Sequence, residues 1–325
     1  MASLAVALRR PHLFFRLRST TSGPGSQSRE EDHNSNDNDS NASSQALRLC
    51  NFAELPKWYQ DNPHILSNYR PVSHSYNVCI QSLGYLHNET VNIYTHLIPA
   101  FVLAFALPTL QIHISRIFID APWMDRFMLT LTPMACLFTL SLSATYHTLM
   151  NHSHGISASC LLLDYTGILA LILASFISGI YVGFYESSFH QQLYWGMILI
   201  LIVTSCLLVL HPRLQGPVYR PHRTAAFILT ALSGFAPVLH GIFRYGLAIA
   251  FHKRGVKWWL AEGVWYGLGA MFFAKRLPES LPWTKRDGRG IFDVWGSSHQ
   301  IFHCCVVAGA ACHCFGVWSA WRCAV

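Results

Sequence analysis

The stretch MILILIVTSCLLVL at residues 197–210 is apolar except for Thr204, Ser205 and the weakly polar Cys206. With the residues around it, the apolar run extends over 193–211. About 20 such residues form a helix that crosses the roughly 30 Å hydrocarbon core of a bilayer. Because a helix satisfies its own backbone hydrogen bonds inside lipid, the stretch predicts a membrane-spanning helix and places the chain among helical membrane proteins.

Six further runs of similar length predict an all-α polytopic membrane protein with seven transmembrane helices. The expected spans are residues 93–112, 126–149, 161–183, 193–211, 224–245, 257–275 and 298–320. The sixth run is the least apolar, because it contains Glu262 and several glycines. Pro99, Pro108, Pro133 and Pro237 lie inside the runs and predict kinks.

The composition agrees with a bilayer environment. Hydrophobic residues make up 52% of the chain and charged residues 12%, whereas soluble proteins carry about 25% charged residues. A net charge of +7 is ordinary for such a protein, and no nucleic-acid partner is expected. Of the 23 Lys and Arg residues, 16 lie on the predicted side of the N-terminus and 7 on the other side. Six of the 16 lie at positions 9–48, far from the first span, and without them the count is 10 against 7. The positive-inside rule therefore predicts a cytosolic N-terminus and an outer or lumenal C-terminus, in the plasma membrane or the endoplasmic reticulum.

The first 92 residues are too polar to span a membrane. Residues 1–22 carry four arginines and no acid, which fits a mitochondrial transit peptide or a basic tail beside anionic lipid, and we favour the tail. Residues 23–44 are rich in Ser, Asn, Asp and Gly and predict disorder. We therefore expect a disordered tail at 1–50, a cytosolic juxtamembrane segment at 51–92 with a short surface helix within 75–88, and a membrane domain at 93–325.

Ionisable side chains cluster at the ends of three predicted spans, where they are costly and therefore indicate function. His299 and His303 are four residues apart at the start of the seventh span, and Ser143 and His147 have the same spacing at the end of the second. Residues with this spacing share one face of a helix. Asp164 lies near the start of the third span. On the predicted topology, all three histidines and Asp164 lie at a similar depth near the cytosolic face.

Three imidazoles that leave one coordination position open are typical of a catalytic zinc site. Asp164 would hydrogen-bond a water on the zinc and take its proton, and Ser143 would donate a hydrogen bond to the reacting oxygen. A competing interpretation makes Asp164 a simple helix N-terminal carboxylate, or the partner of Arg223 or Lys275 in a salt bridge. The remaining intramembrane histidines are expected to be packed, hydrogen-bonded core residues: His96, His113, His240 and His313.

Four motifs give the chain a specific resemblance. They resemble motifs of the progestin and adipoQ receptor family, which is grouped with the hemolysin III proteins. The motifs are HNETVNIYTH at 87–96, SATYH at 143–147, LDYTG at 163–167 and FDVWGSSHQIFH at 292–303. The likeness covers residues 52–320. The polar N-terminus and the sequence GSSHQ at 296–300 resemble those of fungal members. One departure is the link between residues 279 and 292, which is longer and more basic than is usual in the family.

The resemblance implies seven helices, an inward N-terminus and a zinc ion held by His147, His299 and His303. Asp164 matches the acid that contacts the metal-bound water, and Ser143 matches the serine one turn before the first ligand. The family also resembles the alkaline ceramidases.

Our first interpretation is therefore a zinc-dependent intramembrane amide hydrolase, with ceramide, sphingoid base and free fatty acid as lipid partners and a role in lipid and zinc homeostasis. A second interpretation is a receptor of the adiponectin or progestin type, with a structural zinc and an unknown extracellular ligand. A third, a channel or zinc transporter, requires charges along a pore through both leaflets.

Overall fold

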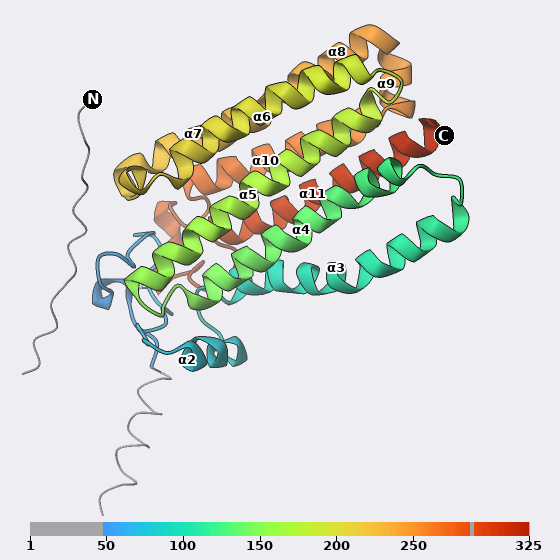
Figure 1. Cartoon of the computed structure of the whole chain (residues 1–325). Coiled ribbons are helices and arrows are strands. Elements are labelled where there is room, and N and C mark those ends of the chain that lie inside the picture. The colour runs from blue at the N-terminus through green and yellow to red at the C-terminus, as the bar shows by residue number, and fades with distance from the viewer. Residues whose placement is uncertain (1–47, 287–288, 325) are drawn as a thin grey trace, which may run out of the picture. The chain divides into compact units, whose positions relative to one another are not determined.

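The computed structural model describes residues 48–286 and 289–324, which form helices apart from loops and one short hairpin (Figure 1). The predictions for the basic and low-complexity tail, and the choice between tail and transit peptide, concern residues 1–47 and lie outside the described ones. The hairpin pairs β1 (Lys285–Arg286) with β2 (Arg289–Gly290) in antiparallel fashion. It occupies the basic link that departs from the family pattern.

Seven long helical segments correspond to the seven predicted spans. They are α3 (Thr90–Ile117), α4 (Trp123–Leu149), α5 (His154–Gly183), α6 (Ser188–Leu210), α7 (Arg220–Leu232) continued by α8 (Phe235–Tyr245), α10 (Val256–Lys275) and α11 (Ser298–Ala324). All except α10 are long and apolar enough to cross a membrane. Helix α10 has 20 residues and packs along α11, so it completes a bundle of seven. Shorter pieces connect them: α9 (Leu247–Lys253), η3 (Pro212–Leu214), η4 (Pro217–Tyr219) and η5 (Pro282–Thr284).

The third span begins earlier than the apolar run predicted. Helix α5 starts at His154 rather than at residue 161, because Ser153 caps it by accepting a hydrogen bond from the backbone N–H of Ile156. Asp164 is therefore ten residues inside the helix, about 15 Å along its axis. The competing interpretation of Asp164 as a helix N-terminal carboxylate was therefore wrong.

The fifth span is broken into two helices at Ser233–Gly234. Pro237 has no N–H to donate to the carbonyl of Ser233, four residues earlier, which explains a break upstream of the proline. By contrast, α3 continues through Pro99 and Pro108, and α4 continues through Pro133.

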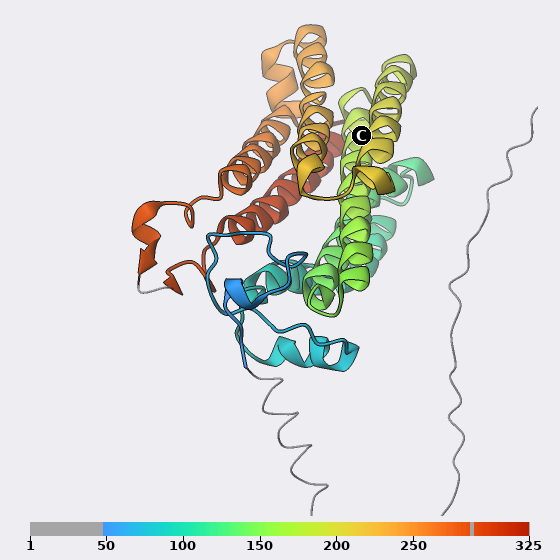
Figure 2. The ribbon, with the colours of Figure 1, turned by 90° about the vertical axis from the view of Figure 1, so that its left-hand side faces the viewer.

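Helix α11 lies against five other helices among the residues described. It packs most extensively on α10 and also contacts α3, α4, α5 and α9 (Figures 1 and 2). Helix α4 lies between α3 and α5, and α6 packs on α5 and α7. The start of α11 and the end of α4 therefore meet at one end of the bundle, here called the site end.

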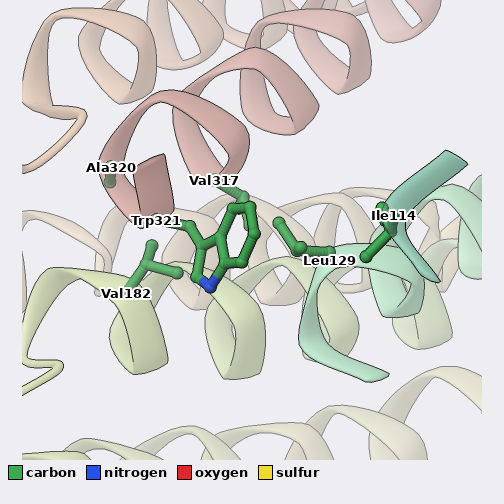
Figure 3. Packing of buried hydrophobic residues seen from close by; sticks show 6 residues of the cluster. All are labelled: Ile114, Leu129, Val182, Val317, Ala320 and Trp321. Carbon is green, nitrogen blue, oxygen red and sulfur yellow. The ribbon is translucent and has the colours of Figure 1, made fainter. Parts of the chain in front are cut away.

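A buried carboxylate holds the opposite end together. Oδ2 of Asp125 accepts hydrogen bonds from Trp321 Nε1 and the Tyr185 hydroxyl, each at 2.8 Å, and Oδ1 accepts one from Tyr181. The indole of Trp321 is fully buried in an apolar cluster drawn from α3, α4, α5 and α11 (Figure 3). Its members are Ile114, Leu129, Val182, Val317, Ala320 and Trp321.

The N-terminal segment packs on the site end. It contains η1 (Phe52–Glu54), α2 (Tyr76–Gln81) and η2 (Ser82–Gly84), so the predicted short helix within 75–88 is present but short. Tyr76 and Ile80 are exposed on it, and its place on a membrane surface stays a prediction. The backbone N–H of Leu66 donates to Asp293 just before α11, at 2.8 Å.

Candidate metal centre

Three histidines from two distant parts of the sequence meet at the site end. His147 lies in the last turn of α4, and His299 and His303 lie in the first two turns of α11. Each offers one ring nitrogen, and the three nitrogens lie within 4.8 Å of one another. His147 and His303 are buried, and His299 is partly buried. The three predicted ligands are thus brought together in an arrangement that could hold one metal ion.

In two of the three histidines, one ring nitrogen is engaged by a neighbouring oxygen, which leaves the other nitrogen for a metal. Nδ1 of His147 is 2.8 Å from Oε2 of Glu89, while its Nε2 is buried without a hydrogen-bond partner among the described residues. Nδ1 of His303 is 3.0 Å from the carbonyl oxygen of Asn92. Histidine ligands commonly engage their second nitrogen with a carboxylate or carbonyl in this way. The residues present therefore fit a metal that prefers imidazole.

Ser143 and Asp164 face each other one turn deeper in the bundle. The hydroxyl of Thr139 on α4 donates to the carbonyl of Gly167 on α5 at 2.7 Å, which fixes the register of these antiparallel helices. One turn further along α4 and one turn back along α5 bring Ser143 opposite Asp164. Ser143 is buried and Asp164 is partly buried. Asp164 is not among the residues whose ligand atoms cluster within 4.8 Å, so it adjoins the triad rather than joining it.

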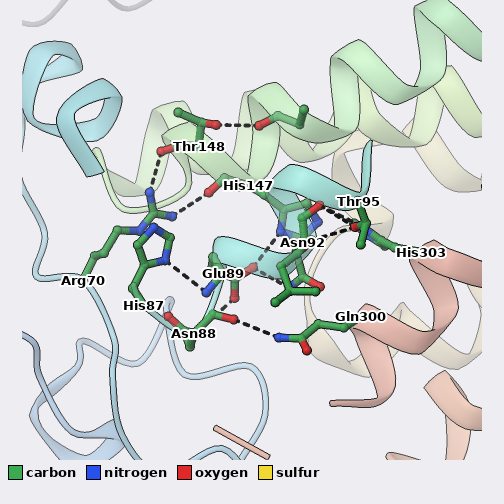
Figure 4. Close-up of polar contacts among 12 residues, drawn as sticks. Arg70, His87, Asn88, Glu89, Asn92, Thr95, His147, Thr148, Gln300 and His303 are labelled. Carbon is green, nitrogen blue, oxygen red and sulfur yellow. Dashed lines mark hydrogen bonds and ion pairs between the residues drawn. The ribbon is translucent and has the colours of Figure 1, made fainter. Parts of the chain in front are cut away.

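Glu89 is the contact that the sequence analysis missed. It precedes α3 and is buried against His147, and its Oε2 also accepts a hydrogen bond from the side chain of Asn92 at 2.7 Å (Figure 4). Its Oε1 accepts one from Asn88 at 3.0 Å. Burial alone would raise the pKa of Glu89, but the interactions with His147 and Asn92 outweigh it and lower the pKa to about 2. Glu89 is therefore an ionised partner of a candidate ligand.

Two buried residues of the N-terminal segment support this arrangement. Arg70 donates to the backbone carbonyls of His147 at 2.5 Å and Thr148 at 3.0 Å, and thereby caps the end of α4 (Figure 4). Nδ1 of His87 accepts a hydrogen bond from the backbone N–H of Glu89 at 3.1 Å. Burial, aided by the charge of Arg70, lowers the pKa of His87 to about 3, so its imidazole is neutral.

A small cavity of about 80 Å³ adjoins the triad. Its lining includes Glu89 and His299 near the site and Asp61, Arg220 and Arg276 further out. Arg220 pairs with the carboxylate of Asp61 at 2.7 Å, and Arg276 donates to the backbone carbonyl of Asp61 at 3.0 Å. These bonds tie the N-terminal segment to α7 and to the end of α10 beside the cavity.

The other intramembrane histidines have varied environments. His313 pairs through Nδ1 with Glu262 at 2.7 Å, and His240 bonds the hydroxyl of Tyr194 at 2.9 Å, as expected of packed residues. His113 is exposed, so the prediction of a core position was wrong for it. His96 is buried and stacks on His303 with a ring separation of 3.8 Å, but neither of its nitrogens has a partner among the described residues.

The two candidate salt bridges of Asp164 gain no support. Arg223 donates instead to the backbone carbonyls of Leu214 at 2.7 Å and Gly216 at 3.2 Å. No salt bridge of Lys275 with Asp164 is found within the described ranges. Asp164 thus keeps its carboxylate free of a cationic partner in this part of the chain.

Comparisons with known proteins agree with this architecture. Residues 84–314 match the family described as haemolysin-III related. The chain is 34% identical over 276 residues to the ADIPOR-like receptor IZH2 of Saccharomyces cerevisiae, a match that covers 85% of this chain and 84% of the yeast protein. It is 33% identical over 270 residues to the adiponectin receptor protein of Drosophila melanogaster, covering 83% of this chain and 59% of the fly protein. Heptahelical transmembrane protein 4 of Arabidopsis thaliana is 41% identical over 178 residues, which cover 54% of this chain and 44% of the plant protein.

Proposed function

Since the chain belongs to the haemolysin-III-related family of heptahelical membrane proteins, we propose that it binds zinc through His147, His299 and His303 and hydrolyses the amide bond of a ceramide-like lipid. The meeting of these three imidazoles at the site end carries the proposal. A three-histidine site leaves a coordination position open, as catalytic rather than structural zinc sites do. When bound, zinc in such a site polarises a carbonyl and lowers the pKa of water towards neutrality.

The residues beside the triad supply the proton transfers. Asp164 accepts a proton from the attacking water as its oxygen adds to the amide carbonyl carbon, and returns that proton to the leaving nitrogen as the C–N bond breaks. Ser143 donates a hydrogen bond to the oxygen that becomes negative during this addition. The products are a free fatty acid and a sphingoid base.

The position of the site favours a lipid substrate. The triad lies at the ends of membrane-spanning helices, within reach of molecules that reside in the bilayer. An open, mostly apolar groove of about 660 Å³ lies between α3 and α4, and its lining includes Leu107, Met134 and Phe138. Because the groove lies in the membrane-spanning part of both helices, we propose that it receives an acyl chain of the lipid.

The test is turnover of labelled ceramide by the purified full-length chain. We expect His303→Ala and chelator treatment each to abolish release of fatty acid, whereas His113→Ala, an exposed position on α3, retains it. Zinc content is measured on the same samples. Undiminished turnover by folded, zinc-free protein would exclude the proposed reaction.

A receptor is the second candidate, because two of the matched relatives are named as receptors. In that case the same metal would tie α4 to α11, and a ligand on the other face would shift the helices. Metal removal would then lower the unfolding temperature and abolish high-affinity ligand binding, while no ceramide would be hydrolysed at any metal content.

We also propose that the site end faces the cytosol, as the distribution of Lys and Arg favours. A reporter fused to the N-terminus would then be protected from protease added outside intact cells, and one fused to the C-terminus would be cleaved. Cleavage of the N-terminal reporter alone would reverse the orientation.

A further inference from the structure

We infer that Glu89 and the carbonyl of Asn92, in the first turn of α3, determine which ring nitrogens of His147 and His303 face the metal, and that Glu89 is a positioning residue that raises the affinity of the triad for a divalent cation. This rests on the metal binding in the proposed function and is independent of the hydrolysis. Both groups belong to the segment at residues 87–96, which adjoins the start of α3.

The contacts fix the ring nitrogens by the chemistry of their partners. A carbonyl oxygen only accepts, so Nδ1 of His303 must carry the hydrogen in its bond to Asn92 at 3.0 Å. A carboxyl group is a stronger acid than an imidazolium, so the hydrogen between Glu89 and His147, whose atoms are 2.8 Å apart, lies on Nδ1 of His147. In both neutral rings the lone pair available to a metal is then on Nε2. The partnerless Nε2 of His147 agrees with this assignment.

Glu89 is itself held in place from several sides. Asn92 and Asn88 each donate to a different carboxylate oxygen, at 2.7 and 3.0 Å, and the backbone N–H of Glu89 donates to His87 at 3.1 Å. A partner fixed in this way holds a ligand in one orientation, which is what a tight metal site needs. Glu89 thus places His147 rather than merely filling space beside it.

The charges of the site lead to the same conclusion. A dication among three neutral imidazoles leaves two positive charges in a region with little water, which is costly. The carboxylate of Glu89, 2.8 Å from Nδ1 of His147, lies where it offsets part of that charge.

The chain contains a matched pair for comparison. Glu262 on α10 bonds Nδ1 of His313 at 2.7 Å, with burial similar to that of the Glu89–His147 pair. Among the residues described, no third metal-binding side chain places its ligand atom within 4.8 Å of those of both Glu262 and His313. Glu262→Gln therefore replaces a buried carboxylate beside a histidine by a neutral amide, as Glu89→Gln does, without touching the triad.

The experiment measures zinc affinity of the full-length chain, stripped of metal and titrated against a chromophoric chelator. Glu89→Gln removes the negative charge and turns one acceptor oxygen, which now receives a hydrogen bond from Asn88 or Asn92, into an N–H donor. We expect it to weaken zinc binding by about 10–100-fold, as mutation of a ligand's hydrogen-bond partner does in other zinc sites. We expect Glu262→Gln to bind zinc like the wild type. Cobalt absorption spectra should differ from wild type for Glu89→Gln alone, because a reoriented His147 changes the ligand field.

The outcomes separate this inference from the proposed function. If the wild type binds no zinc, the proposed metal site fails and the inference fails with it. If the wild type binds zinc and both glutamine variants bind equally well, the inference alone is overturned. Should Glu89→Gln fail to fold, ¹⁵N-histidine spectra of the wild type loaded with ¹¹³Cd decide: coupling to Nε2 of His147 and His303 supports the inference, and coupling to Nδ1 of either overturns it.

Discussion

Replacing Arg70 by methionine tests whether the N-terminal segment holds the metal centre in place. Arg70 is fully buried, and its guanidinium donates to the hydroxyl of Ser82 at 2.7 Å and to the carbonyls of His147 and Thr148 at 2.5 and 3.0 Å. Methionine is similar in length but has no donor. The variant leaves the last carbonyls of α4 without their partner, at the residue that carries a candidate ligand.

The three bonds give the expected size of the effect. Each hydrogen bond to a charged group contributes about 1.5–3 kcal/mol to stability. Removing a buried charge also relieves the cost of its desolvation, which offsets part of that loss. We therefore expect Arg70→Met to lower the free energy of unfolding by about 3 kcal/mol, which corresponds to a fall in Tm on the order of 5–10 °C.

The assay is thermal unfolding together with zinc titration, with Arg223→Met as the matched control. Arg223 is also buried and also donates to two backbone carbonyls, but these belong to Leu214 and Gly216 before α7. Both variants should lose stability, whereas only Arg70→Met should lose zinc affinity, by about 10-fold. A wild-type Tm for Arg70→Met, or equal zinc affinity in the two variants, would refute the reasoning.

Three further predictions concern packing, the opposite end of the bundle and pH. Gly309→Ala would place a Cβ 2.6 Å from the ring of Tyr266, so we expect a loss of about 1–3 kcal/mol in thermal unfolding, with Gly196→Ala, which has open space, as the neutral control. Asp125→Ala leaves three donors without their acceptor, each costing about 1–3 kcal/mol, and should lower Tm strongly while the folded fraction binds zinc normally. The pKa of His87 is about 3 in the folded chain, below its ordinary value, so the unfolded chain takes up the proton first and stability falls as the pH drops from 6.5 towards 3. Denaturant unfolding of His87→Gln should show a shallower fall over that window.

Each of these predictions has an outcome that contradicts it. Equal stability of the two glycine variants would mean that the ring of Tyr266 moves aside without cost. Loss of zinc affinity in folded Asp125→Ala would show that the two ends of the bundle are coupled. Identical pH profiles for His87→Gln and the wild type would assign the acid sensitivity to other groups.

The seven-helix architecture could be predicted because a bilayer requires apolar runs of a fixed length. The ends of the helices could not, since hydropathy marks where lipid begins rather than where a helix begins. Helix α5 starts seven residues before its apolar run because Ser153 caps it, and this moved Asp164 away from the helix start. The break in the fifth span was indicated by Pro237, but it lies upstream at Ser233–Gly234, since Pro237 has no N–H to donate to the carbonyl of Ser233.

The triad could be predicted because His299 and His303 share a helix face, and the order of the spans brings His147 to the same end. Glu89 could not be found in this way. It lies 58 residues before His147, outside any apolar run, and no periodicity links the two. The sequence did show an acidic residue directly before the first span, within the motif at residues 87–96, but that motif indicated only the family and no role for Glu89. The role of Arg70 could not be predicted either, because two of its partners are backbone carbonyls, and the pattern of side chains in a sequence does not indicate such contacts.

The N-terminal segment and the start of α11 meet at the same centre, and this has a consequence for biogenesis. His147 is synthesised long before His299 and His303, and the N-terminal segment must wait for Asp293 and Glu279 to emerge before it can bond to them. A ribosome that stalls before residue 298 would release six inserted helices with only one of the three candidate ligands, His147, and an uncovered site end. The triad is therefore assembled only in the completed protein, and the arrival of the last helix is the step that completes the site end.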